Sequence, residues 1–141
     1  QMAWIKVDDQ PGREVDLTGL FAMMQAETFG GGYRVAPGMQ PFGDNASIVL
    51  GFGLTKLQML RVMGPLEKGR HVGKWGKISM EPCRRFEIKA LDSEGNPTDE
   101  KGHDPPLFIS LDGEISMTTP VSFEFHEGQL NVRGGQSPPN L

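Results

Sequence analysis

Residues 47–52 read Ser-Ile-Val-Leu-Gly-Phe, a continuous apolar run of strand length. Such a run is typical of a strand that is buried on both faces, so we expect it at the centre of a sheet. A second stretch, residues 85–91, alternates polar and apolar side chains and predicts a strand with Phe86, Ile88 and Ala90 on one face. Together the two stretches favour a mainly β fold.

Glycine and proline divide the rest of the chain into short segments. The 19 glycines and 11 prolines leave few stretches that could keep a helical period. Residues 92–106 are polar and rich in turn formers, and they predict a long loop. The other predicted elements are strands at 4–7 and 17–24, a short helix at 55–63, and hairpins at 107–117 and 121–132 that turn at Asp112-Gly113 and Glu127-Gly128.

Composition restricts the size, the partners and the compartment of the protein. A chain of 141 residues is long enough for one domain with its own core. The formal net charge of -4 lacks the broad cationic field that nucleic-acid binding requires. Cys83 is the only cysteine, which excludes an intrachain disulfide and a cysteine-cluster metal site and favours the reducing cytoplasm.

The hydropathy pattern predicts that any membrane contact is peripheral. No run of 18 or more apolar residues occurs, and the first nine residues lack the basic start and apolar stretch of a secretory signal. Gln1 stands ahead of Met2, which is consistent either with a residue left over from cloning or with a cut made inside a longer chain.

Three short motifs carry residues that are suited to chemistry. Gly30-Gly31-Gly32 could bring the backbone close to a ligand, although a tight bend between strands is the plainer interpretation. Gly43-Asp44-Asn45 is a turn that presents a carboxylate. Asp112-Gly113-Glu114 places two carboxylates at a hairpin tip, where the alternative is a solvated turn with two exposed acids.

The order of the motifs along the chain is more specific than any one of them. The segments stand in the order Gly30-Gly31-Gly32, Ala36-Pro37-Gly38, Asp44-Asn45-Ala46-Ser47-Ile48, Gly69-Arg70-His71, Leu111-Asp112-Gly113-Glu114 and Thr119-Pro120-Val121. This order resembles the C-terminal domain of the diacylglycerol kinase, sphingosine kinase and bacterial lipid kinase superfamily, over nearly all of the chain. The resemblance implies a β-sandwich of largely antiparallel strands with one or two short helices.

The resemblance also implies a division of labour between two domains. In these kinases an N-terminal domain with a Gly-Gly-Asp-Gly-Thr loop holds ATP and Mg²⁺, and the C-terminal domain covers the cleft and helps to receive the lipid. No Gly-Gly-Asp-Gly-Thr occurs in this chain. We therefore expect the isolated chain to be inactive, because phosphoryl transfer depends on positioned and charge-neutralised phosphates.

The resemblance further assigns roles to individual residues. Asp112 and Glu114 match the acidic hairpin that is proposed to supply the general base toward the lipid hydroxyl. Asp44 matches the acidic residue of a structural Mg²⁺ site, although Asn45 and Ile48 depart from the family's pattern there. The implied substrate-binding residues are Gly30, Gly31, Gly32 and His71.

Two further groups of side chains suit a lipid, each with a plain alternative. His71 stands near Lys68, Arg70 and Lys74, a basic cluster that could approach anionic headgroups or could be ordinary surface charge. Met23, Met24, Met59 and Met63 could line an acyl-chain groove, but packing in the core is the favoured interpretation.

The sequence thus leads to two functional hypotheses. The first is the substrate domain of an ATP-dependent lipid kinase, whose partners are a lipid and an ATP-binding N-terminal domain. The second is a stand-alone, non-catalytic module that binds lipid or another protein. Under either hypothesis the chain could touch a membrane peripherally, and an exposed strand edge could pair with a second copy to form a homodimer.

Overall fold

The computed structural model describes residues 2–40, 43–99, 107–111 and 114–127. Strands dominate it, and every strand pairing is antiparallel, which confirms the mainly β fold. The elements in chain order are β1 Met2–Val7, β2 Arg13–Asp16, β3 Phe21–Met24, β4 Ala46–Gly51, α1 Lys56–Glu67, the 3₁₀ turn η1 Lys74–Gly76, β5 Ile78–Cys83, β6 Arg85–Leu91, β7 Pro97–Thr98, β8 Phe108–Leu111, β9 Glu114–Thr118 and β10 Val121–Glu124.

Strand β4 lies at the centre of a three-stranded sheet of order β3-β4-β5, as predicted. All of its residues are buried. Ile48 and Leu50 belong to one hydrophobic cluster, whereas Val49 belongs to a second cluster that also contains Val62 of α1. Because successive side chains of a strand point to opposite faces, β4 is covered on both sides.

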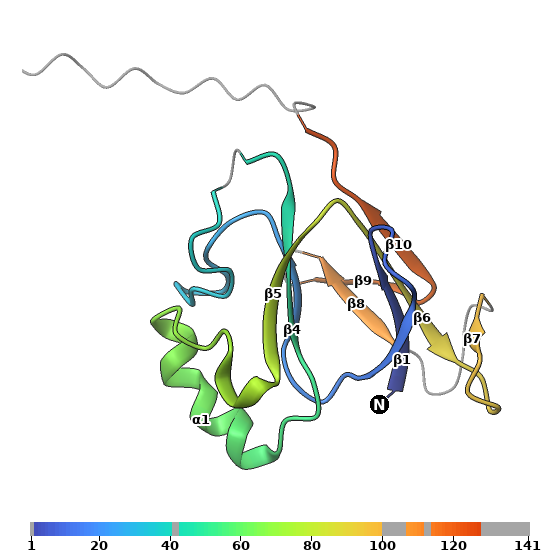
Figure 1. Ribbon diagram of the computed structural model, residues 1–141, viewed down its shortest axis with the longest axis horizontal. Helices are drawn as coiled ribbons and strands as arrows, with labels where there is room; N and C mark the ends of the chain where they lie inside the picture. Colours follow the sequence, from blue (N-terminus) through green and yellow to red (C-terminus); the bar gives the residue numbers. More distant parts are fainter. Residues whose placement is uncertain (1, 41–42, 100–106, 112–113, 128–141) are drawn as a thin grey trace, which may run out of the picture.

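A second sheet has the order β10-β6-β1-β2, with the short β7 also paired to β6. Ile5 of β1 stands opposite Ile88 of β6, and both side chains are buried together with Phe86 and Ala90. The predicted inward face of residues 85–91 is therefore confirmed. Both sheets contribute residues to the first cluster, and Figure 1 shows the sheet of β4 and β5 beside the strands β1 and β6 of the second sheet. The finer arrangement as a two-layer sandwich stays a prediction.

The predicted strand at 17–24 is confirmed only in its second half, as β3, because residues 17–20 carry the chain from the end of β2 to the other sheet. Strand β2 ends at Asp16, whose carboxylate accepts hydrogen bonds from the Thr18 backbone N–H at 3.0 Å and hydroxyl at 2.8 Å. A Cβ on Gly19 would lie 2.0 Å from the Gly51 carbonyl oxygen, so only glycine permits this crossing. Strand β3 begins after it.

Helix α1 begins where the sequence predicts and continues beyond the predicted end. Thr55 caps it, since its hydroxyl accepts from the Gln58 N–H while the Gln58 side chain accepts from the Thr55 N–H. The helix continues through Pro65 to Glu67, and the side chain of Leu66 in its last turn is buried. No helix within the described residues is long and apolar enough to cross a membrane.

The expectation that all four methionines pack in the core is half wrong. Met24 is buried and Met23 is partly buried against the first cluster, as expected. Met59 and Met63 are exposed on α1, because the helix turns Val62 and Leu66 inward instead.

The C-terminal strands follow the predicted order only in part. Strands β8 and β9 pair as the predicted hairpin, while its turn at Asp112-Gly113 lies outside the described residues. Strand β10 pairs with β6, and the predicted turn partner Gly128 and all later residues also lie outside. Within the predicted loop 92–106, the short β7 pairs with β6.

Candidate functional site

A pocket with a volume of about 410 Å³ opens between the segment after β3 and the strands β4 and β5. Its size falls within the usual range of small-molecule sites. Apolar side chains and polar oxygens share the lining, which suits a ligand with a polar and an apolar part. The lining residues are Pro37, Gly38, Met39, Gln40, Gly43, Asp44, Asn45, Ser47, Met80 and Pro82.

The three glycines form the tip of a small hairpin that leads toward this pocket. Phe29 and Tyr33 exchange backbone hydrogen bonds of 2.9 and 3.2 Å across the tip. Gly30, Gly31 and Gly32 have φ angles of 47°, 79° and 102°, so the backbone conformation requires glycine. A Cβ on any of them would meet nothing within 4 Å, so the tip stands free of close packing. The tight-bend interpretation is thus confirmed, and substrate binding by the tip stays a prediction.

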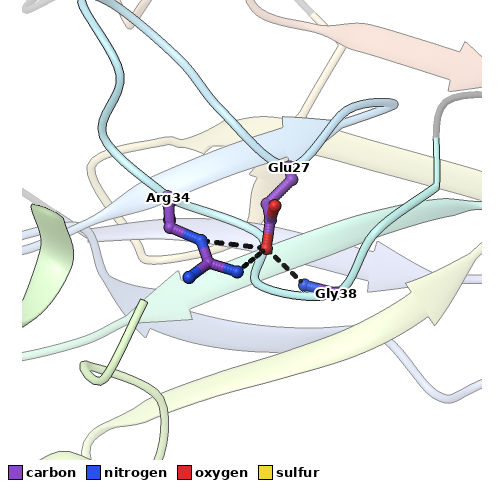
Figure 2. Close-up of polar contacts among 3 residues, drawn as sticks. All are labelled: Glu27, Arg34 and Gly38. Carbon is purple, nitrogen blue, oxygen red and sulfur yellow. Dashed lines mark hydrogen bonds and ion pairs between the residues drawn. The ribbon is translucent and has the colours of Figure 1, made fainter. Parts of the chain in front are cut away.

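A carboxylate closes the base of the glycine hairpin. One oxygen of Glu27 accepts from Arg34 Nε at 3.1 Å, from Arg34 Nη2 at 2.6 Å and from the Gly38 N–H at 2.8 Å (Figure 2). The Gly38 hydrogen bond and then the Arg34 hydrogen bond lower the pKa of Glu27 below its ordinary value of 4.5. Glu27 therefore fixes the position of Gly38, which lines the pocket.

Asp44 is the one acid among the described residues that line the pocket, and it is exposed. Asn45 and Gln40 add amide oxygens nearby, and such oxygens suit a hard cation. No group of three His, Cys, Asp or Glu side chains that could hold a metal ion occurs in the part of the chain that the structure describes. A metal site at Asp44 therefore stays a prediction.

His71 lies in the interior and not at the surface with Lys68 and Arg70. Its side chain is fully buried, and its Nε2 lies 3.0 Å from the Val35 carbonyl oxygen. Burial lowers the pKa of His71, and this outweighs the opposing effect of the Val35 hydrogen bond. In this conformation the ring has no surface to offer a headgroup. It connects the turn after α1 to the segment that leads into the pocket.

The two predicted catalytic acids are not both described. Glu114 is exposed at the start of β9, with Leu111 opposite it in the ladder, and it is not among the described residues that line the pocket. Asp112 lies outside the described residues, so its catalytic role stays a prediction.

Sequence reasoning missed Glu27 and Arg34, which hold the hairpin, and it also missed Met39 and Ser47. The Ser47 hydroxyl lies 3.1 Å from the Met39 sulfur, a contact that joins β4 to the pocket loop. A signal for the first pair exists in the sequence, because opposite charges flank the three glycines at a spacing of seven residues.

Comparisons with known proteins identify no family for the chain. No protein-family model, no curated protein and no solved structure matches it. Its function is therefore inferred from its own residues and from the order of their motifs.

Proposed function

We propose that this chain is the substrate-side domain of an ATP-dependent lipid kinase similar to the diacylglycerol and sphingosine kinases. One observation carries the proposal: two motif segments that are separate in sequence line one pocket. Pro37 and Gly38 come from the Ala-Pro-Gly segment, and Asp44, Asn45 and Ser47 come from the following turn. The mainly antiparallel β fold agrees with this proposal.

The pocket lining suits a lipid acceptor with a hydroxylated headgroup. Met39 and Met80 would contact the apolar part, because methionine adapts to irregular apolar shapes. Asp44 would accept hydrogen bonds from headgroup hydroxyls or hold the Mg²⁺, and the Asn45 amide would accept from or donate to such hydroxyls.

ATP would be held by a separate half of the enzyme. Among the described residues the glycine segment forms a hairpin tip bridged by Phe29 and Tyr33, not the start of a helix. A glycine-rich phosphate cradle normally opens a helix N-terminus. In the joined enzyme Asp112 would take the proton of the lipid hydroxyl while that oxygen attacks the γ-phosphorus and ADP leaves.

The test uses the native gene product, isolated from its source. We expect its intact mass to exceed that of 141 residues and to include an ATP-binding half. We expect it to transfer the labelled γ-phosphate of ATP to diacylglycerol or to sphingosine in mixed micelles. Asp112→Asn should lower kcat by about 10²–10⁴-fold with an unchanged Tm, the usual range for a lost general base.

The matched control is Asp9→Asn, which removes a carboxylate that is 96% exposed in the turn after β1. It should leave kcat unchanged. Full activity of Asp112→Asn would remove Asp112 from the role of base, and a wild-type product that phosphorylates neither lipid would overturn the kinase proposal.

A second function, lipid binding without catalysis, is favoured by a different observation. The pocket and the exposed apolar face of α1 are both formed by residues of this chain. Under this function the isolated chain would take up a fluorescent diacylglycerol without nucleotide, and the native product would carry no kinase activity.

A further inference from the structure

Helix α1 exposes four of its large apolar side chains. Its buried residues, Val62 and Leu66, are one turn apart, and the apolar residues around the opposite side remain open. Leu60 is 73% exposed and Leu57 55%, and Met59 and Met63 are exposed beside them. A surface helix normally carries polar groups on its outer side, so this face needs a partner.

The same segment concentrates positive charge in an acidic protein. Residues 56–77 contain six Lys or Arg and a single Glu, a formal charge of +5. The rest of the chain contains eight Lys or Arg against seventeen Asp or Glu, a formal charge of -9. Lys77 is held by the Gly53 carbonyl, but Lys56, Arg61, Lys68 and Arg70 are exposed. The partner of this face is therefore expected to be anionic.

An aromatic side chain near the end of this segment adds a second feature. Trp75 is 44% exposed and has a φ angle of 54°, a left-handed conformation that is strained for a bulky residue. Strain of this kind concentrates at functional positions. Tryptophan is also enriched at the headgroup level of membranes, because its ring is apolar and its N–H is polar.

We infer that residues 56–77 form a docking surface for a bilayer that contains acidic phospholipid. Leu57, Leu60 and Met63 would enter the boundary between headgroups and acyl chains while Lys68 and Arg70 face the lipid phosphates. Exposed apolar side chains flanked by cations, on a chain that is otherwise acidic, complement such a surface. The assignment stands on this segment alone and does not depend on kinase activity.

Docking through α1 would also bring the pocket close to its lipid. Val62 and Leu66 of α1 pack in the cluster that includes Val35, and the pocket-lining Met39 and Met80 pack against that cluster. A Cβ on Gly69, in the turn after α1, would lie 3.0 Å from Pro37 Cβ, so this turn touches the pocket wall. Figure 1 shows α1 on the side of the molecule away from β6 and β7.

The test measures partitioning of the 141-residue chain onto vesicles by flotation, without nucleotide. One set of vesicles is pure phosphatidylcholine, and the other contains about one-third phosphatidylserine. We expect binding to the acidic vesicles only, weakened when salt rises from about 0.1 M to 0.5 M because the Debye length shortens. Trp75 emission should shift to the blue on binding, and Trp75→Phe should abolish the shift.

Two variants separate the apolar and the charged contributions. Leu57→Gln with Leu60→Gln should weaken partitioning at least about tenfold, and Lys68→Gln with Arg70→Gln should weaken it by about 10–30-fold. The controls are Ile115→Gln, an equally exposed apolar residue on β9, and Arg84→Gln, an exposed cation between β5 and β6. Neither control should change partitioning.

Three outcomes would overturn the inference. The first is equal binding of wild type and both double variants. The second is equal binding to neutral and acidic vesicles. The third is that the wild type binds no vesicles and that the molar mass from light scattering is half as large in the double leucine variant as in the wild type. That result would mean that the apolar face of α1 contacts a second copy of the chain. Vesicle binding by a native product without kinase activity would contradict the proposed kinase function alone.

Discussion

At the residue scale, His71 combines complete burial with one ring nitrogen that finds no hydrogen-bond partner among the described residues. Its Nε2 must carry the hydrogen to donate to the Val35 carbonyl, so Nδ1 is left as a bare acceptor. Nδ1 is buried and has no hydrogen-bond partner among the described residues. Protonation of the ring would bury a charge and an unpaired donor, which explains why burial lowers the pKa of His71.

A lowered histidine pKa makes the folded protein sensitive to acid. The unfolded chain takes up a proton near pH 6.5, whereas the folded chain resists it, so the free energy of unfolding falls as pH drops below 6.5. We expect urea unfolding to report a smaller free energy of unfolding at pH 5.5 than at pH 7.5. His71→Gln should remove much of this difference between the two pH values. It should also lower the free energy of unfolding at pH 7.5 by about 1 kcal/mol, because the hydrogen bond to the Val35 carbonyl is weakened.

The control for this prediction is His126→Gln. The His126 side chain is 62% exposed. This variant should keep the pH dependence of the wild type. An equal pH dependence in wild type and His71→Gln would show that another group causes it.

At the scale of an element, the glycine hairpin depends on the Glu27 carboxylate more than on its own ladder. The hairpin has a single isolated bridge, between Phe29 and Tyr33. Arg34 and Gly38 are both held by Glu27, so loss of its charge should loosen residues 28–38. We expect Glu27→Gln to accelerate amide hydrogen exchange there, with unchanged exchange in β4.

The pH dependence of this effect follows from the lowered pKa of Glu27. A carboxyl whose pKa is lower in the folded state stabilises the fold above its ordinary pKa of 4.5 and loses that contribution as pH falls through the folded value. At equal pH, the difference in amide exchange rate of residues 28–38 between wild type and Glu27→Gln should therefore become smaller below about pH 4.5. Glu94→Gln removes an exposed carboxylate from another turn and should leave residues 28–38 unaffected at every pH.

Most elements could be predicted from the sequence because local chemistry determines them. Residues 85–91 alternate strictly, and the helix at Thr55 has a complete capping box, so both were found. The crossing inside 17–24 was missed because it depends on the contact between Gly19 and Gly51, which are far apart in sequence. The exposure of Met59 was missed for a similar reason, since periodicity alone does not say which face of a helix the core covers.

At the scale of the whole molecule, the candidate site was only partly predictable. Asp44 was singled out as a lone carboxylate in a turn, but the pocket beside it is assembled from two chain segments and needs Met80 of β5. Glu27 acts across eleven residues to hold Gly38, which no short motif encodes. Sequence motifs thus identified the backbone turns of the site, and tertiary packing supplied its walls.

The first hydrophobic cluster joins the two main sheets, so they should unfold as one unit. Ile5 of β1 and Ile48 of β4 lie in different sheets and are both fully buried in this cluster with Cys83. Burial, together with the charges of Asp8 and Glu81, raises the pKa of the Cys83 thiol to about 11. Cys83 should therefore react with a disulfide reagent at pH 8 only when the core opens.

Labelling of Cys83 tests whether the two sheets open together. Ile5→Val and Ile48→Val each remove one buried methyl group, which destabilises a core by about 1 kcal/mol and should speed labelling about fivefold. Ile115→Val removes the same group from a side chain that is 71% exposed and should change nothing. If Ile48→Val accelerates labelling and Ile5→Val does not, the sheet of β4 opens without the sheet of β1. Equal acceleration would mean that the pocket and the docking helix, which pack on β4 and its neighbours, are as stable as the entire molecule.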